Sequence, residues 1–183
     1  MTVLVTYASK HDATRGIAER IAHDLNAAGV PTDIQPVQTA GDVAGYDGFV
    51  IGSATYAFHW MKEARSFVRR HQKVLSERPV WLFSSGPLGT EKTDAEGRDV
   101  RERSKPKEIA ELVETLHPRG EHVFFGALDP KKLTLTERMV RSTPAGRKLM
   151  PEGDFRDWDD VDEWSRGIAQ EVKGAASGPS PGR

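Results

Sequence analysis

The sequence predicts a three-layer α/β fold built on a doubly wound, five-stranded parallel sheet with strand order 2-1-3-4-5. Short apolar runs alternate with segments of helical periodicity from the first residues onward, which is the pattern of successive βαβ units. The short runs are mostly apolar, as expected of strands that helices cover on both faces. In this strand order, ligands bind beside strand 1, where the winding direction reverses.

Each expected element follows from a local pattern. Val3–Tyr7 is rich in β-branched residues, as strands are. Residues 13–28 repeat apolar side chains at helical spacing and are followed by Gly29, a typical residue after a helix. The expected strands are Val3–Tyr7, Asp33–Val37, Phe49–Gly52, Val80–Ser85 and His122–Leu128, and the expected helices are 13–28, Met61–Leu75, Lys107–Leu116 and Asp159–Lys173.

Composition limits the classes of function. The 183 residues fit a single domain, expected over 1–173, and the Gly-, Pro- and Ser-rich tail 174–183 is expected to be disordered. The 26 basic and 27 acidic residues nearly balance, which argues against a nucleic-acid partner. The absence of cysteine excludes disulfides, thiolate catalysis and iron–sulfur clusters, and the histidines lack metal-ligand spacing, so no metal is expected. A redox function would therefore need an organic cofactor.

The sequence also predicts where the protein is found. No apolar run is long enough to cross a bilayer. The chain opens directly on a strand pattern, without the basic and long apolar regions of a signal peptide. We therefore expect a cytoplasmic protein that makes at most peripheral contact with the inner face of the membrane.

The loop after the first strand has the chemistry of a phosphate site. Hydroxyls, a cation and loop amides converge where a helix begins, and the positive end of the helix dipole adds to their attraction for an anion. The spacing suits a terminal phosphate, because the GxGxxG pattern of dinucleotide binders is absent. The alternative is a plain capping turn with Asp12 or Thr14 as the N-cap. The loop residues are Ser9, Lys10, His11, Asp12, Ala13 and Thr14.

Residues 7–14 match, without a gap, the phosphate loop of the flavodoxin-like superfamily, and DVAGYDGFVIGSATY (42–56) resembles its third-strand segment. This resemblance implies FMN, bound non-covalently at the carboxyl ends of the strands, with residues 9–14 around its phosphate. Asp12 stands where the family usually has glycine. Asp tolerates a positive φ better than most residues, but its carboxylate would have to turn its charge away from a phosphate, with Lys10 and Arg15 offsetting that charge.

In that fold, the loops after the third and fourth strands hold the isoalloxazine ring. We expect Tyr56 and Trp60 to form the pocket wall, and interpret Phe58 as a core residue at least as readily as a pocket residue. Gly86 and Gly89 would let backbone approach a planar ligand, although a simple Gly-Pro turn explains them too. The second loop has no aromatic residue, which leaves one flavin face open to a substrate. The expected residues are Ser53, Ala54, Thr55, Tyr56, Trp60, Ser84, Ser85, Gly86, Pro87 and Gly89.

The downstream half resembles the menaquinone-dependent protoporphyrinogen dehydrogenase branch of this superfamily, through Phe67–His71, Gly126–Leu128 and Asp157-Trp158. The resemblance implies an FMN-dependent oxidoreductase of haem biosynthesis that oxidises protoporphyrinogen, or a similar reduced substrate, with a quinone or another acceptor. The alternatives are a one-electron carrier of the flavodoxin type and a protein that binds a deazaflavin such as F420, or no cofactor. The near-neutral charge and the long insertions argue against the carrier.

Two stretches exceed what a minimal fold needs, namely 86–105 and 129–158. Within the second, Lys131–Met150 interleaves basic and apolar residues. Such an element could rest on an anionic membrane or bind the propionates of a porphyrin. We favour an ordinary surface helix whose apolar side packs on the domain, because Pro144 and Gly146 interrupt the pattern.

Overall fold

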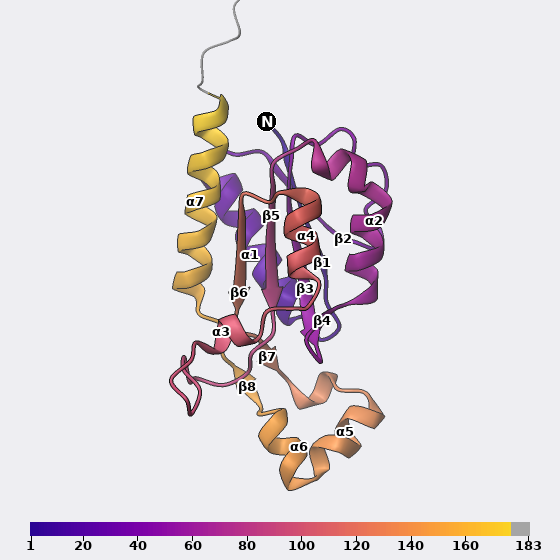
Figure 1. The fold of residues 1–183 in the computed structure, drawn as a ribbon, viewed down its shortest axis with the longest axis vertical. Coiled ribbons are helices and arrows are strands. Elements are labelled where there is room, and N and C mark those ends of the chain that lie inside the picture. Colours follow the sequence, from indigo (N-terminus) through magenta and orange to yellow (C-terminus); the bar gives the residue numbers. More distant parts are fainter. Residues whose placement is uncertain (177–183) are drawn as a thin grey trace, which may run out of the picture.

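The computed structural model, which describes residues 1–176, confirms the predicted sheet (Figure 1). Five parallel strands lie in the order β2-β1-β3-β5-β6, which is 2-1-3-4-5 when the main strands alone are counted. A short strand β4 (His59–Trp60) pairs antiparallel with the end of β3. The main strands are β1 (Val3–Ala8), β2 (Thr32–Pro36), β3 (Gly48–Tyr56), β5 (Val80–Ser85) and β6 (Gly120–Phe124).

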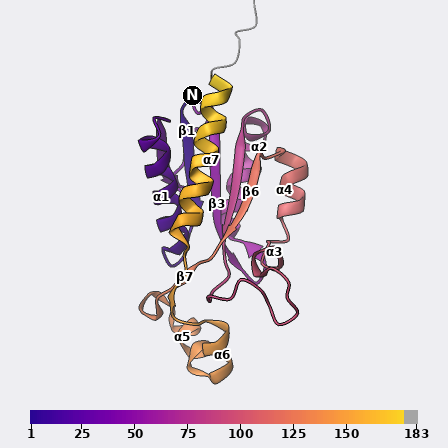
Figure 2. The same cartoon turned by 90° about the vertical axis from the view of Figure 1, so that its left-hand side faces the viewer.

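Helices cover both faces of the sheet, as the mostly apolar strands predict. Figure 2 shows α1 (Ala13–Ala27) and α7 (Trp158–Ala176) on one side, and α2 (Lys62–Ser76) and α4 (Ile109–Leu116) on the other. Alternate strand residues enter different cores, since successive side chains of a strand point to opposite faces. Leu4, for example, packs in the α2–α4 core, and its neighbour Val5 in the α1–α7 core.

The fifth expected strand is shorter than predicted. The sheet strand β6 ends at Phe124, so the expected extent His122–Leu128 is wrong. The chain leaves the sheet there and forms β7 (Ala127–Leu128), which pairs antiparallel with β8 (Gly153–Asp154). This two-stranded ribbon is the stem of an insertion, and residues 129–152 between its strands are called the insert below.

The insert consists of two short helices beyond the carboxyl end of the sheet (Figure 1). Our interpretation of a single surface helix packed on the domain is wrong, because Leu135 is 78% and Leu149 75% exposed. Pro144 begins the second helix, at a position where its missing amide is not needed. The helical segments are η1 (Pro130–Lys132), α5 (Leu135–Ser142) and α6 (Pro144–Leu149).

The long connection after β5 is ordered by ion pairs and a short helix, α3 (Val100–Arg103). Asp94 accepts hydrogen bonds from Arg103 at 2.6 Å and from Arg98 at 2.9 Å. These bonds, with the hydrogen bond from Arg103 first, hold the pKa of Asp94 well below its usual range. The charged residues of this stretch thus form a compact turn.

The last helix, α7, begins at Trp158 and continues past the expected end at Lys173 to Ala176. Residues 177–183 of the expected tail lie outside the described part of the chain. In the part that the structure describes, none of the helices has both the length and the apolar composition needed to cross a membrane.

The hairpin between β3 and β4 is strained. Tyr56 pairs with His59, so only Ala57 and Phe58 form the turn, and their φ angles are 49° and 64°. A two-residue hairpin of this kind requires positive φ at both central positions, where glycine and asparagine are preferred. β3 therefore runs on to Tyr56, beyond the expected end at Gly52, and turns back at a cost in backbone strain.

We expect Ala57→Gly to stabilise the protein. Relief of the left-handed strain exceeds the added flexibility of the unfolded chain by up to about 1 kcal/mol, which corresponds to a rise in Tm of roughly 2–4 °C. Ala110→Gly, at an exposed position of α4, is the matched control and should lower Tm, since glycine weakens helices by about 0.5–1 kcal/mol. Thermal unfolding followed by circular dichroism measures both. Equal destabilisation by the two changes would contradict the interpretation.

Candidate functional site

The loops expected to hold the cofactor leave the sheet side by side. Ala8 at the end of β1 is in register with Ser53 of β3, and Ala54 is in register with Ser85 at the end of β5. Because these three strands are parallel neighbours, the loops after them meet at one edge of the sheet (Figure 1). The structure therefore brings together the three groups of residues that the sequence assigned to one site.

The first loop leads into a helix end that is not capped by a side chain. Asp12 is the N-cap residue of α1 with φ 65°, a conformation that aspartate tolerates, and its carboxylate makes no capping hydrogen bond. Thr14 lies inside the first turn. Asp12 therefore takes the N-cap place that the alternative of a plain capping turn gives it, but no side chain caps the helix. The first amides of α1 have no partner within the helix, and together with the helix dipole they form an anion site.

Two buried hydroxyls of this loop have no hydrogen-bond partner among the described residues. They are Ser9 Oγ and Thr14 Oγ1, and Thr14 is only 1% exposed. Buried polar groups are nearly always paired, and leaving one unpaired costs about 1–3 kcal/mol. A phosphate at this helix end would accept hydrogen bonds from both hydroxyls. The residues present therefore fit the terminal phosphate of FMN.

The insert supplies counter-charges to the loop. Glu137 of α5 accepts a hydrogen bond from Lys10 Nζ at 2.6 Å, and its carboxylate lies 3.2 Å from His11 Nε2. Lys132 Nζ donates to the Asp12 carboxylate at 2.7 Å. These contacts join residues more than a hundred positions apart, so no local pattern in the sequence indicates them.

The offset of the Asp12 charge differs from what we expected. A hydrogen bond from Lys132 is the main cause that lowers the pKa of Asp12. Lys10 is instead held by Glu137, and Arg15 pairs with a glutamate of its own helix at 2.7 Å, adding only a weaker electrostatic effect on Asp12. The carboxylate of Asp12 is therefore drawn toward the insert.

Glu137 is the centre of charge between loop and insert. Desolvation opposes its ionisation, but hydrogen bonds from Lys10, Thr134 and His11 outweigh this and lower the pKa of Glu137 to about 2. Desolvation and the nearby Glu137 charge raise the pKa of Tyr56 to about 12. At neutral pH the site thus contains a carboxylate at Glu137 and an un-ionised phenol at Tyr56.

Arg156, which the sequence analysis missed, lies beside the same helix end. Its Nη1 is 3.5 Å from the carbonyl oxygen of Ala13, and its guanidinium stacks 4.6 Å from the ring centre of Trp158. A Cβ at Gly16 would lie 2.4 Å from Nη1, so a side chain there would have to push the Arg156 guanidinium aside. An Arg two residues before the Trp that opens the last helix was the only signal available. Arg156 thus lies at the phosphate end of the site, where its charge is paired with the Asp154 carboxylate, which accepts from Arg156 Nε at 2.8 Å.

Tyr56 lies in the β3–β4 hairpin where we expected it, but Trp60 does not. Tyr56 is 42% exposed, with its ring centre 5.8 Å from Lys10 Nζ, as suits a wall residue. Phe58, for which a core and a pocket position were both open, is 54% exposed. Trp60, expected in the wall, is 1% exposed and packs in the α2–α4 core. Phe58 thus lies exposed in the two-residue turn, and Trp60, two residues further along, packs into the core.

Trp60 and Glu108 hold the hairpin in place. Trp60 Nε1 donates to Ser84 Oγ at 2.8 Å and so ties the first flavin loop to the second. The Glu108 carboxylate accepts from the Trp60 amide at 3.2 Å and lies 2.8 Å from His59 Nδ1. Ser53 Oγ accepts from the amide that opens α2. Ser53, Ser84 and His59 are thus occupied by the protein itself, whereas the buried Thr55 hydroxyl has no partner among residues 1–176.

The second flavin loop combines close packing with one open position. A Cβ at Gly86 would lie 3.3 Å from Thr55, so this glycine allows the two loops to approach each other rather than a ligand. Pro87 is buried, and its carbonyl accepts from the amide of Gly126. Gly89 has φ 116° and open space around its missing side chain. It is therefore the position where a ligand could contact this backbone.

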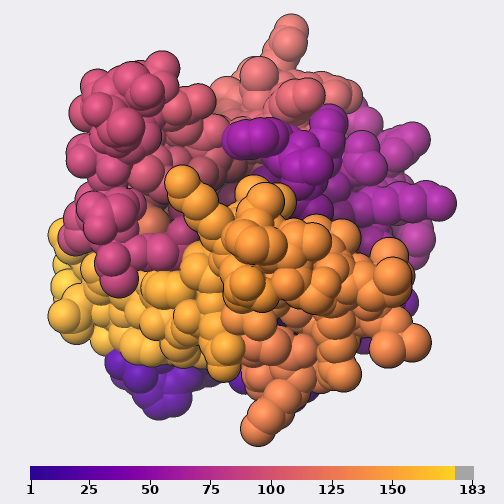
Figure 3. Space-filling view, turned by 90° about the horizontal axis from the view of Figure 1, so that it is seen from below, coloured from indigo at the N-terminus to yellow at the C-terminus, as the bar shows by residue number. Residues whose placement is uncertain are grey.

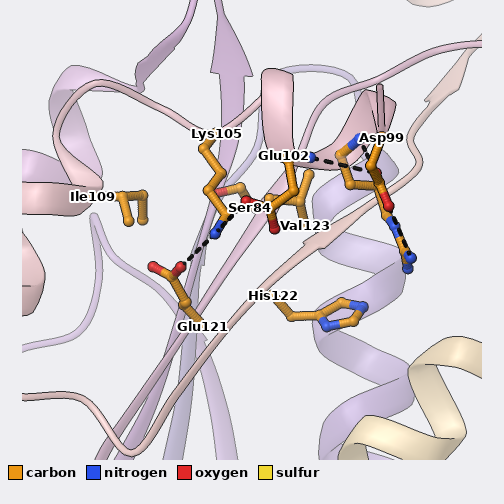
Figure 4. A pocket seen from close by; sticks show the side chains of 9 residues that line it. Ser84, Asp99, Glu102, Lys105, Ile109, Glu121, His122 and Val123 are labelled. Carbon is orange, nitrogen blue, oxygen red and sulfur yellow. Dashed lines mark hydrogen bonds and ion pairs between the residues drawn. The ribbon is translucent and has the colours of Figure 1, made fainter. Parts of the chain in front are cut away.

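Two open cavities and one narrow pocket surround these loops. A cavity of about 380 Å³ lies between the phosphate loop and the base of the insert, and one of about 550 Å³ borders Gly89 and the start of α7. A pocket of about 150 Å³ beside Ser84 is lined by charged side chains that pair with one another. Among them, Lys105 Nζ lies 2.8 Å from the Glu121 carboxylate (Figure 4). Among residues 1–176, no cluster of His, Cys, Asp or Glu is placed to hold a metal ion.

The fold and the phosphate loop define a flavodoxin-like redox flavoprotein. A family model for the flavodoxin domain matches residues 4–143, and the chain belongs to this family. Family, fold and the free hydroxyls at the helix end together indicate FMN as the cofactor.

Individual relatives agree with this class. The chain is 24% identical over 180 residues to the protoporphyrinogen IX dehydrogenase [quinone] of Escherichia coli strain K12, covering 92% of this chain and 95% of the relative. The structure of this chain is similar to that of a flavodoxin from the domain Archaea, with TM-score 0.59 at 15% identity, over 94% of this chain and 99% of the flavodoxin. The rubredoxin oxygen:oxidoreductase of Desulfovibrio gigas gives TM-score 0.62 at 11% identity, over 97% of this chain and 37% of that one.

Thr14→Val tests the phosphate site. The change keeps the shape but removes a hydroxyl whose hydrogen bond to a charged group contributes about 1.5–3 kcal/mol. We expect FMN affinity to fall on the order of tenfold to a hundredfold, with riboflavin affinity unchanged. Thr6→Val is the matched control, because the Thr6 hydroxyl is also buried without a described partner but lies within β1. Titration of the apoprotein with both flavins, followed by fluorescence, measures the effect. A parallel loss for FMN and riboflavin would reduce Thr14 to a structural residue.

Glu137→Gln tests the contact between insert and loop. Loss of the charge weakens the bonds to Lys10 and His11, each worth about 1.5–3 kcal/mol. We expect hydrogen exchange of the α5 amides to accelerate on the order of tenfold to a hundredfold, while the sheet is unchanged. Glu152→Gln, which removes an exposed ion pair with Arg141 in the same insert, should have little effect.

Acidification should reproduce this change in the unmodified protein. The folded-state pKa of Glu137, about 2, lies below its ordinary value. The contact is therefore at full strength above about pH 4.3 and is lost as the pH falls toward 2. In Glu137→Gln, exchange of α5 amides, corrected for intrinsic pH dependence, should no longer show this step. A step of equal size in both proteins would assign it to another group.

Proposed function

We propose that the chain is an FMN-dependent oxidoreductase that oxidises protoporphyrinogen, or a similar reduced substrate, with a quinone as acceptor. The observation that carries the redox assignment is the pair of buried, unpartnered hydroxyls of Ser9 and Thr14 at an uncapped helix end. The name of the E. coli relative supports the donor and the acceptor. The open position at Gly89 supports access of a substrate to the ring.

The residues of the chain bind and orient, while bound FMN supplies the two-electron redox chemistry. Ser9 and Thr14 would hold the phosphate with the first amides of α1, and Arg156 lies beside them. Tyr56, an un-ionised phenol, lines the ring side. Trp60 keeps the two flavin loops at a fixed separation through Ser84. The proposed reaction needs no side-chain nucleophile, because the flavin carries the redox chemistry.

The cavity next to Gly89 suits a planar substrate with acidic groups. Its volume of about 550 Å³ lies within the range of small-molecule sites. Phe125, Phe155 and Trp158 offer apolar surface, and Lys92 and Arg156 offer cations, although three aspartates also line the cavity. In each turn of the reaction, the substrate would lose two electrons and two protons, and the quinone would gain both and become a quinol.

A quinone acceptor also bears on location. Long-chain quinones reside in the bilayer, so an enzyme without a described membrane-spanning helix would have to meet them at the surface. We therefore include peripheral contact with the inner face of the membrane in the proposal.

Turnover separates this function from that of an electron carrier. The FMN-loaded protein, kept anaerobic, should form fluorescent protoporphyrin from protoporphyrinogen IX only when a quinone such as menadione is present. Apoprotein without added FMN is the control and should give only the background rate. Lack of turnover, combined with reduction of the bound flavin by a flavodoxin reductase, would favour the carrier. A protein that retains F420 in place of FMN would favour the deazaflavin alternative.

A further inference from the structure

The most exposed large apolar side chains of residues 1–176 are gathered on the insert. Leu135 is 78%, Leu149 75% and Met139 72% exposed, and Val140 is 49% exposed. The exposure of large apolar side chains elsewhere in the described chain does not exceed 54%, at Phe58. Grouped apolar exposure of this kind marks a surface that another partner or a membrane covers.

Basic residues accompany these apolar side chains. Between residues 130 and 151, six residues are basic and only Glu137 is acidic. Glu137 is turned toward the phosphate loop, where it binds Lys10. Within the described chain, Arg138, Arg147 and Lys148 form no ion pair with a carboxylate and are exposed. The outer side of the insert is therefore both apolar and positively charged.

The geometry of α5 separates its inner and outer sides. Leu135 and Met139 are four residues apart, so they lie on one face of the helix, and Glu137 between them lies on the opposite face. Figure 1 shows α5 and α6 as the far end of the molecule, and Figure 3, looking onto that end, shows the insert facing outward. The outer face is thus free of contact with the body of the protein.

We propose that this outer face of α5 and α6 docks on a bilayer that contains anionic phospholipid. Apolar side chains would enter the region between headgroups and acyl chains, and the basic residues would face the headgroup charge, as in other interfacial amphipathic helices. The helices have eight and six residues, too short to cross a bilayer. Charge complementarity selects the lipid surface over a second copy of this chain, whose matching face would be equally positive.

Docking of this face would bring the cofactor edge of the sheet close to the membrane. The insert projects from the same end of the sheet as the phosphate and flavin loops (Figure 1). This gives the proposed quinone acceptor a short path to the site. The inference deepens the proposed function but can be tested without it, because lipid binding needs neither substrate nor quinone.

The test is cosedimentation of the FMN-loaded protein with vesicles of phosphatidylcholine alone or mixed with phosphatidylglycerol. We expect binding only to the anionic vesicles, weakening with salt. The double variant Leu135→Ser/Met139→Ser should bind at least tenfold more weakly, and Arg147→Gln/Lys148→Gln should both weaken binding and reduce its salt dependence. Matched controls are Val113→Ser, an exposed apolar residue of α4, and Arg69→Gln/Arg70→Gln on α2, which should bind like the unmodified protein.

Three outcomes would overturn the docking surface. They are no binding to anionic vesicles, equal losses in the control variants, and a dimer that Leu135→Ser/Met139→Ser dissociates while vesicle binding stays unchanged. Turnover with water-soluble menadione, measured without vesicles, reports on the proposed function separately. Intact turnover with lost vesicle binding in the Leu135→Ser/Met139→Ser variant is the expected combination.

Discussion

The parallel register of β1, β3 and β5 determines where everything else in the molecule can be. Both faces of these strands are buried. A register shift by one residue would therefore turn each side chain into the opposite core, where it would meet the wrong packing partners. The register fixes Ala8 level with Ser53, and Ala54 level with Ser85. The phosphate loop and both flavin loops then begin at the same edge. Side chains at the site can be small and polar because the strands beneath them carry the packing.

The elements and the phosphate loop were predictable because their signals are local. The apolar run Val80–Ser85 by itself predicts a buried strand, and the observed strand β5 has the same bounds. Asp12 shows how far a local argument extends. Its φ of 65° is one that short polar side chains tolerate. Its ionic partner, Lys132, lies on a segment that no pattern near residue 12 can indicate.

The remaining site depends on contacts that cross the chain. Phe58 and Trp60 are separated by one residue, and their sequence context gave no means to decide which of them is buried. The decision is made by a two-residue turn in an unfavourable conformation and by Glu108, a residue of another segment that binds the Trp60 amide. Arg156 likewise reaches α1 only because the stem of the insert returns the chain to that point. The position of a residue that depends on such a long-range contact cannot be predicted from the periodicity of the sequence around it.

The contact of Glu137 with Lys10 and His11 makes two equilibria share the same side chains. One is the closing of the insert onto the loop, and the other is the occupation of the loop by phosphate. Thermodynamic reciprocity then applies, since any factor by which phosphate changes the closing of the insert is also the factor by which closing changes the affinity for phosphate. A lipid surface that holds the insert would therefore alter the retention of FMN. The loading of FMN would alter attachment to that surface by the same coupling free energy.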